Sequence, residues 1–238
     1  MSSNTTTVST PRIVELRHNI LKKNDQLARA LRQRFAEAGV FVVNVVSSPG
    51  SGKTALLERT LTTLAPKLSL ATLVGDLATD NDAKRLAQSG TKVKQIETGT
   101  LCHLEAEMIG HYLGDWDLTE IDLLFIENVG NLVCPSSYDL GEDSRVAIFS
   151  TTEGEDKPLK YPTLINSADV AIISKMDLAE AVEFDRAQMH ASLRAMRPDI
   201  HIFETSAKTG AGLDDWYTWL EQRVLAKQKN HQQASPSS

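Results

Sequence analysis

The sequence predicts an α/β protein with a mostly parallel β-sheet that is covered by helices on both faces. Short runs rich in β-branched residues alternate with amphipathic stretches along most of the chain. These runs are almost continuously apolar, which is typical of strands buried on both faces of a parallel sheet. A loop of glycine and serine follows the first run directly, and in such folds ligands bind at the carboxyl ends of strands. The candidate strands span residues 41–46, 70–74, 93–96, 123–126, 146–149, 170–173 and 200–203.

The composition indicates a soluble globular protein of 238 residues. The 25 Lys and Arg against 31 Asp and Glu give a net charge of −6, whereas a nucleic-acid-binding protein would show clustered basic residues. The apolar runs are far shorter than the roughly 18 residues of a membrane helix. The two cysteines form no Cys-x-x-Cys pair, and the first ten residues do not resemble a signal peptide. We therefore expect a cytoplasmic protein without disulfides that binds neither nucleic acid nor a membrane.

The two ends of the chain differ from the middle. Residues 1–9 are rich in Ser and Thr, and residues 227–238 are polar and without periodicity, so we expect both to be disordered. In residues 10–38 apolar side chains recur at spacings of three, four and seven, which predicts an amphipathic helix. The main domain is then expected to span residues 39–226.

The strongest motif is SSPGSGKT at residues 47–54, between the first strand and a helical stretch, and it resembles a Walker A P-loop. Glycines let backbone N–H groups approach phosphates closely, and the following helix presents its positive end to them. Lys53 is expected on the β- and γ-phosphates, and the Thr54 hydroxyl on Mg²⁺. Ser47 stands where the motif usually begins with glycine. The predicted nucleotide-binding residues of this loop are Pro49, Gly50, Ser51, Gly52, Lys53, Thr54 and Ala55.

Two carboxylates at the ends of predicted strands are candidates for the Mg²⁺ site. Asp76 ends the run TLVGD, and Glu127 ends the buried run IDLLFIE, where a Walker B acid belongs. A buried carboxylate is unfavourable unless a cation or hydrogen-bond donors compensate it, which favours a metal site with Thr54. Asp76 is also the candidate for orienting the attacking water, beside Lys53 as a catalytic residue. Thr79, Asp80 and Asp82 follow Asp76, where a nucleotide-sensing loop is expected, but Asp80 and Asp82 could equally be helix caps or surface charges.

Two further motifs at strand ends resemble the guanine-specificity motifs of GTPases. They are SKMD at residues 174–177 and SAK at residues 206–208. The Asp177 carboxylate can accept from the ring N–H and the exocyclic amine of guanine, a pair that adenine lacks, so that ATP would leave it unpaired. Ser174 replaces the usual Asn, and this shorter donor is expected to lower the affinity for the base. The predicted base-binding residues are Lys175, Asp177, Ser206, Ala207 and Lys208.

Cys102, His103 and Cys134 are the candidate ligands of a softer metal. Thiolate and imidazole suit Zn²⁺ in tetrahedral geometry or Ni²⁺ in planar geometry. Neighbouring residues of a helix point about 100° apart, so Cys102 and His103 could both ligate only if the start of the predicted helix is irregular. From composition alone, inert buried cysteines are the better interpretation.

The stretches NVVSSPGSGKT, ETGTLCHLEA, ENVGNLVCP, TEGEDKPLKYP, SKMDL and SAKTG together resemble the hydrogenase nickel-incorporation GTPases, the HypB family. The resemblance implies a P-loop NTPase fold of the SIMIBI class that dimerises on binding GTP or metal. It implies that Cys102, His103 and Cys134 hold nickel or zinc, and that the cofactors are GTP, Mg²⁺ and Ni²⁺ or Zn²⁺. The implied partners are an accessory protein of the HypA type and the [NiFe]-hydrogenase large subunit precursor. Gly130 in ENVGN is placed where its N–H could sense the γ-phosphate.

Three alternatives to this interpretation remain. A urease-type nickel GTPase has the same general plan but carries a Cys-Pro-His motif, whereas Cys102 and His103 are adjacent here. A P-loop kinase acting on a small molecule is supported by the P-loop and opposed by the two guanine motifs. A metal-independent binding module would use the nucleotide only as a structural core.

Overall fold

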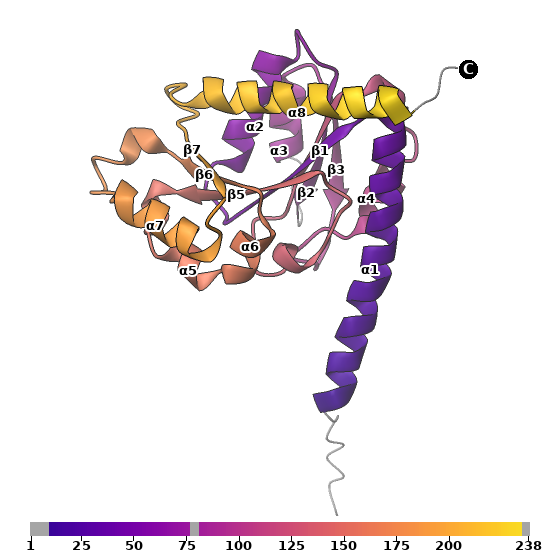
Figure 1. The fold of residues 1–238 in the computed structure, drawn as a ribbon, viewed down its shortest axis with the longest axis horizontal. Coiled ribbons are helices and arrows are strands. Elements are labelled where there is room, and N and C mark those ends of the chain that lie inside the picture. The colour runs from indigo at the N-terminus through magenta and orange to yellow at the C-terminus, as the bar shows by residue number, and fades with distance from the viewer. Residues whose placement is uncertain (1–9, 77–80, 235–238) are drawn as a thin grey trace, which may run out of the picture.

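The computed structural model describes residues 10–76 and 81–234. Parallel strands form one sheet, and helices cover both of its faces, as the sequence predicts (Figure 1). No helix within the described ranges is both long and apolar enough to cross a membrane. The disorder predicted for residues 1–9 concerns a segment outside the described residues.

The sheet has seven strands in the order β3-β2-β4-β1-β5-β6-β7, and each pair of neighbours is parallel. Each predicted strand is present, with bounds within two residues of those expected. The register pairs Glu127 of β4 with Val45 of β1 and Val74 of β2. The carboxyl ends of these three strands therefore lie at one edge. The strands are β1 Phe41–Ser47, β2 Leu70–Asp76, β3 Lys92–Glu97, β4 Leu123–Glu127, β5 Ser144–Ser150, β6 Val170–Ser174 and β7 His201–Glu204.

Alternate strand residues face opposite helical layers. Val43 and Val45 pack in the core cluster that includes residues of α2 and α8, whereas Val42 packs in the cluster that includes α1 and α4. A third cluster lies under α6 and α7. The five inner strands are thereby buried on both sides, which explains their continuous apolar runs, whereas the edge strands β3 and β7 are partly exposed. The helices are α1 Thr10–Ala38, α2 Lys53–Leu64, α3 Asn81–Ala87, α4 Ala106–Tyr112, α5 Lys157–Lys160, α6 Pro162–Ser167, α7 Arg186–Met196 and α8 Leu213–Ala234, with short 3₁₀ turns at Leu118–Glu120, Pro135–Ser137, Thr151–Glu153 and Met176–Leu178.

The helix α1 spans the predicted residues 10–38, and its carboxyl half packs against the rest of the domain. Leu31 and Phe35 are buried against α4 and the sheet, and Asn24 is buried as well. Ile20, on the same predicted stripe, is 51% exposed. The first part of α1 extends beyond the body of the domain (Figure 1).

The prediction that residues 227–238 are disordered was wrong for residues 227–234, which continue α8. Lys227 Nζ lies 2.5 Å from Asp143 Oδ1, and Gln228 donates to Asp122 Oδ1 at 2.6 Å. Asp122 and Asp143 directly precede β4 and β5. The polar composition thus reflects a helix that is anchored by polar contacts to the amino-terminal edge of the sheet. Residues 235–238 lie outside the described residues.

Truncation tests this anchoring. A chain that ends at Ala226 loses the Lys227 and Gln228 contacts, so we expect its free energy of unfolding to fall by about 1–3 kcal/mol. A chain that ends at Ala234 keeps these contacts and should match the full-length protein. Urea denaturation of the three proteins measures the difference, and equal stability of all three would show that the end of α8 contributes nothing.

Candidate functional site

The P-loop lies between β1 and α2 and forms the floor of a cavity of about 430 Å³. Gly50 and Gly52 have φ angles of 73° and 96°, which favour glycine, so the backbone can turn around a phosphate as the motif predicts. Lys53 begins α2. The cavity is lined by Pro49, Gly50, Ser51, Gly52, Lys53, Thr54, Ala55, Gly75, Asp76, Asp82, Arg85, Glu127, Val129 and Gly130. The structure therefore brings the predicted phosphate and Mg²⁺ residues into one cavity.

Glu127 is the buried acid of this cavity, with 1% of its surface exposed. Thr54 Oγ1 donates to its Oε1 at 2.7 Å, and Lys53 Nζ lies 3.8 Å from the same oxygen. Oε2 is buried and accepts no hydrogen bond from the described residues. Burial raises the pKa of Glu127 to about 7, although Lys53 and the Thr54 hydroxyl lower it. A buried carboxylate oxygen without a partner, beside a hydroxyl, fits the hard oxygen donors that Mg²⁺ prefers.

The other acids differ in their positions. Asp76 ends β2 and lines the cavity with Glu127, which places it where a third oxygen ligand or a water-orienting group is expected. Asp82 lies in the first turn of α3 and also lines the cavity. Thr79 and Asp80 lie outside the described residues. Of the two alternatives for Asp82, its place in the lining of the cavity favours the nucleotide-sensing one.

Gly130 packs directly on the P-loop. A Cβ at this position would meet the backbone and ring of Pro49 at 3.2 Å. A Cβ at this position would require the segment after β4 or the P-loop to shift by a few tenths of an ångström. A displacement of the P-loop at Pro49 would therefore displace the segment at Gly130, as expected of a loop that senses the γ-phosphate.

The two predicted guanine motifs meet the P-loop at the ends of β6 and β7. Lys175, with a φ of 58°, donates from Nζ to the Gly50 carbonyl at 2.7 Å. Ser174 Oγ donates to the Ser51 carbonyl at 2.6 Å and is buried. Ser174 therefore ties the base-binding loop to the P-loop. The expectation that it acts as a short donor to the base does not match this position, because its hydroxyl is used within the protein.

Asp177 and the SAK segment form the second part of the predicted base site. Ser206 Oγ donates to Asp177 Oδ1 at 2.6 Å, and Lys208 Nζ lies 3.9 Å from Oδ2. Ser206 is fully buried, so it holds the orientation of the carboxylate. A second cavity of about 550 Å³ beside Ala207 and Lys208 leaves space next to this segment.

Two basic side chains reach these loops and were missed by the sequence interpretation. Arg59 of α2 donates to the Ala207 carbonyl at 2.9 Å, which fixes the backbone of the SAK segment. Lys157 of α5 donates to Ser48 Oγ in the P-loop at 2.6 Å. Lys157 belongs to the TEGEDKPLKYP stretch, so that motif was a signal. For Arg59 no signal exists in the sequence, because its partner is 148 residues away.

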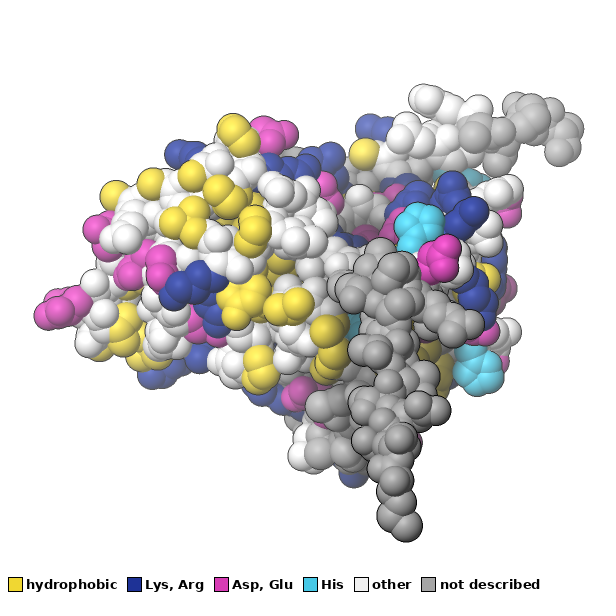
Figure 2. Space-filling view, turned by 90° about the horizontal axis from the view of Figure 1, so that it is seen from below, with side chains coloured by type: hydrophobic (Ala, Val, Ile, Leu, Met, Phe, Trp, Pro, Cys, Tyr) yellow, Lys and Arg dark blue, Asp and Glu magenta, His cyan; other side chains and the backbone are white. Residues whose placement is uncertain are grey.

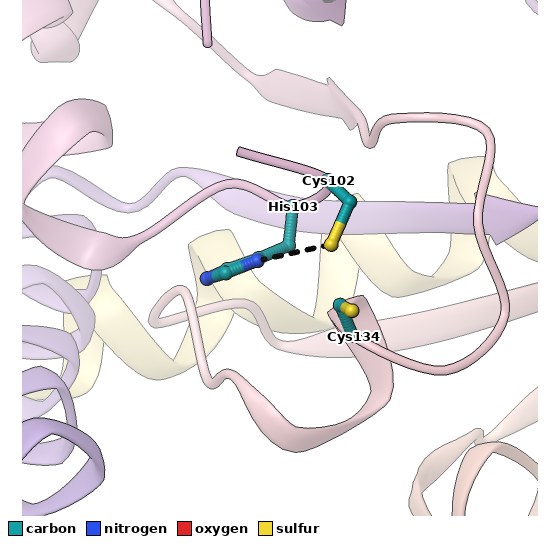
Figure 3. A group of neighbouring side chains, drawn as sticks. All are labelled: Cys102, His103 and Cys134. Atoms are coloured by element: carbon teal, nitrogen blue, oxygen red, sulfur yellow. Dashed lines mark hydrogen bonds between the residues drawn. The ribbon is translucent and has the colours of Figure 1, made fainter. Parts of the chain in front are cut away.

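Cys102, His103 and Cys134 converge beyond the end of β4 (Figure 3). Their ligand atoms all lie within 4.8 Å of one another, and Cys102 Sγ is 3.9 Å from His103 Nδ1. Cys102 and His103 precede α4, which begins at Ala106, so they occupy irregular backbone. This meets the condition under which both neighbours can ligate one ion. The structure thus makes a shared metal site geometrically possible.

The surroundings of the cluster also fit a metal. A hydrogen bond with Cys134, together with burial, raises the pKa of the Cys102 thiol. His103 is buried, its Nε2 lies 3.3 Å from Glu105 Oε1, and its ring stacks on Tyr138 with 3.9 Å between centroids. A carboxylate behind a histidine is a common second partner of metal-binding imidazoles. A cation that displaces the thiol protons would offset the negative charge of two neighbouring thiolates. Sequence interpretation missed Glu105 and Tyr138.

Comparison with known proteins agrees with this arrangement. The model of the "CobW/HypB/UreG, nucleotide-binding domain" family matches residues 41–204. Hydrogenase maturation factor HypB of Azotobacter vinelandii is 48% identical over 216 residues, which cover 91% of this chain and 71% of that protein. The crystal structure of HypB from Archaeoglobus fulgidus has a TM-score of 0.80 at 39% identity and covers 85% of this chain and 99% of that chain. HypB from Helicobacter pylori in complex with nickel has a TM-score of 0.80 at 42% identity, with coverages of 91% and 99%.

The raised pKa of Glu127 predicts a pH-dependent stability of the protein free of nucleotide and Mg²⁺. The folded state holds the Glu127 proton more tightly than the unfolded chain, so this contribution is present at low pH and is lost as the pH rises to 7 and above. Glu127→Gln lacks this titration. We expect its unfolding free energy, relative to wild type, to increase by roughly 2–3 kcal/mol between pH 5 and pH 8.

Urea denaturation at pH 5, 6, 7 and 8 measures this difference. Glu107→Gln is the matched control, because Glu107 is an exposed acid that pairs with Lys23. A stability difference between Glu127→Gln and wild type that stays constant over this range would contradict the assignment of a raised pKa.

Proposed function

The chain belongs to the CobW/HypB/UreG family and, within it, to the hydrogenase maturation factors HypB, and from this premise we propose that it is a nickel metallochaperone or regulator that helps insert nickel into the [NiFe]-hydrogenase large subunit precursor. As a member of this family it is a P-loop GTPase. One observation carries the proposal: the loop that begins at Glu127 of the nucleotide cavity leads within seven residues to Cys134 of the metal cluster. Nucleotide and nickel sites thereby share one short segment.

Hydrolysis by this site would depend mainly on positioning and on neutralising charge. Lys53 and the backbone N–H groups of the P-loop would bind the phosphates. Thr54, Glu127 and Asp76 would hold Mg²⁺, which when bound supplies positive charge at the β- and γ-phosphates. Asp76 would also orient the attacking water. The Gly130 segment, packed against Pro49, would report the presence of the γ-phosphate.

Guanine selectivity would come from Asp177 and the SAK segment. The carboxylate of Asp177 is held by Ser206 and can accept from two N–H groups of guanine. Ala207 would offer its N–H to the guanine carbonyl, and Lys175 and Lys208 would flank the base. ATP would leave the carboxylate unpaired, which opposes the alternative of an ATP-dependent kinase.

Nickel is proposed as the cargo of the Cys102, His103 and Cys134 cluster, with Zn²⁺ as the other ion that these ligands suit. Leu101 and Val133 flank the two cysteines and are 37% and 60% exposed. The face seen from below carries further hydrophobic side chains (Figure 2). Such surfaces fit subunits that pair when GTP or metal binds, or contact with an accessory protein of the HypA type. The adjacency of Cys102 and His103 separates the cluster from the Cys-Pro-His motif of the urease-type alternative.

The nucleotide would act as a switch. GTP must bind one arrangement of the domain more tightly than the other, because a ligand with equal affinity for both shifts nothing. Subunit pairing in the GTP state would reshape the cluster, and hydrolysis would release the nickel to the next protein.

Exchange of Asp177 tests the guanine assignment. Asp177→Asn replaces one of the accepting oxygens with an N–H donor, so we expect GTP affinity to fall by about 100-fold, with little change for ATP. Nucleotide competition measures both, with Asp215→Asn, an exposed acid of α8, as the control. If ATP displaced labelled GTP from the wild type as effectively as GTP itself does, guanine selectivity would be ruled out.

Lys53→Ala should abolish steady GTP hydrolysis. A binding module that uses the nucleotide only as a structural core would show no such hydrolysis in the wild type.

Removal of one sulfur tests the metal assignment. Cys134→Ala leaves two protein ligands, so we expect nickel affinity to fall at least about tenfold, with loss of thiolate-to-nickel absorption. Titration with Ni²⁺ and with Zn²⁺ measures this. His190→Ala is the control, because His190 pairs with Glu204 away from the cluster. Equal affinities of wild type and Cys134→Ala would remove Cys134 from the ligand set.

A further inference from the structure

A network of four buried polar side chains joins β1, the residue after β4 and the start of β5. Its members, here called the core network, are Asn44, Asn128, Glu142 and Arg145, and each is at most 8% exposed. Asn128 Nδ2 donates to Asn44 Oδ1 at 3.3 Å, and Asn44 Nδ2 donates to Glu142 Oε1 at 3.0 Å. Arg145 donates from Nε and Nη2 to the same Glu142 oxygen, at 2.9 and 2.6 Å. Buried polar groups of this kind require complete hydrogen bonding.

The donor and acceptor of each hydrogen bond in the core network are determined by the groups at the two ends of the network, Arg145 and the backbone N–H groups that bind Asn128. Glu142 Oε1 already accepts two hydrogen bonds from Arg145, so Asn44 turns the NH2 of its side-chain amide toward this oxygen. The Asn44 oxygen then faces Asn128, which must donate. The Asn128 oxygen remains for backbone N–H groups and accepts from Leu104 at 3.2 Å and Val129 at 3.0 Å. The amide of Asn128 can therefore not be reversed without leaving buried groups unpaired.

Both halves of the metal cluster are attached to this network. On one side, the Leu104 N–H that Asn128 binds follows His103 directly. On the other side, Arg145 donates to the Ser136 carbonyl at 2.9 Å and to the Tyr138 carbonyl at 2.7 Å, just after Cys134. The Tyr138 ring stacks on His103. The core network thus sets the distance between the two segments that carry the ligands.

The other end of the network reaches the nucleotide cavity. Asn128 follows Glu127, and its own N–H donates to the Val45 carbonyl of β1 at 3.0 Å. Asn44 lies on β1, which leads into the P-loop at Ser47. A nucleotide that changes the bond between Thr54 and Glu127 acts one residue away from Asn128. Because close-packed interiors do not absorb small displacements, a shift of Asn128 reaches Leu104 and His103.

We propose that Asn128 is a positioning residue that transmits nucleotide occupancy from Glu127 to His103, so that the core network sets nickel affinity according to the bound nucleotide. This inference rests on the proposed function. One side-chain amide, which belongs to neither the predicted nucleotide site nor the metal cluster, thus couples nucleotide binding to nickel affinity.

Asn24 provides a matched comparison. This asparagine of α1 is also buried and also holds backbone around the cluster, since its Oδ1 accepts from the Ala106 N–H at 2.9 Å and its Nδ2 donates to the Asp139 carbonyl at 2.8 Å. Both of its contacts lie close to the same ligand segments. Neither contact involves Glu127, Asn128 or the P-loop. Asn24 therefore supports the cluster without contacting Asn128.

The experiment measures the nickel dissociation constant and the thiolate-to-nickel absorption band of the full chain, each with GDP and with a non-hydrolysable GTP analogue plus Mg²⁺. We expect the two nucleotides to change the wild-type nickel affinity by a factor between about 5 and 150. Asn128→Ala should bring this factor close to 1. Asn128→Ser serves as a second variant, since its short hydroxyl preserves polarity without reaching both partners. Asn24→Ala should keep the wild-type factor even where both affinities fall together.

The outcomes are separable. Circular dichroism and nucleotide affinity first establish that each variant is folded and loaded. An Asn128→Ser protein with the full wild-type factor overturns the inference, and so does an equal loss of the factor in Asn24→Ala. A wild type that binds nickel with the same affinity in both nucleotide states also overturns it, while leaving nickel binding intact. A wild type that binds no nickel at the cluster overturns the proposed function itself.

Discussion

The common register of β1, β2 and β4 is the constraint on which the rest of the site depends. It places Glu127 level with Val45 and Val74, and therefore beside the P-loop that begins two residues after Val45. Parallel strands end at the same edge, so loops from distant parts of the chain meet there. The phosphate loop, the acids and the segment leading to Cys134 are neighbours for this reason. A shift of β4 by one residue would turn Glu127 to the other face of the sheet.

Burial of Glu127 makes the nucleotide site sensitive to charge. A carboxylate with 1% exposure, one oxygen of which accepts no hydrogen bond from the residues that the structure describes, is unfavourable in its ionised form, and its raised pKa reflects this. A divalent cation would remove the penalty, because it supplies the opposite charge that Thr54 and Lys53 supply only in part. Under the proposed function, the same surroundings that destabilise the ionised acid would favour binding of Mg-nucleotide over the empty state. Binding energy would then be available to move the segment that follows Glu127.

The separation of Cys102, His103 and Cys134 depends more on the contacts that surround these residues than on their own backbone conformation. Cys102 and His103 lie in irregular backbone, which by itself would allow many arrangements. Asn128 holds the following residue from the sheet side, Asn24 holds the start of α4 from α1, and Arg145 holds the segment after Cys134. These buried bonds give the ligands a defined separation in the absence of an ion. Preorganisation of this kind lowers the cost of binding and lets a distant event alter affinity.

The sequence alone was sufficient to predict the strands and to place the glycine-rich loop, the acids Asp76 and Glu127 and the SKMD and SAK segments at strand ends. Each of these positions depends on local periodicity or on residues adjacent in the chain. Tertiary structure decided the rest. The polar end of α8 is helical because it reaches Asp122 and Asp143. Ser174 binds the P-loop, and Arg59 binds a carbonyl 148 residues away. The core network joins β1, β4 and β5 through side chains whose bonding is set by strand register. Hydrophobic pattern reports which face is buried, but partners across the sheet are determined only once the strands are aligned.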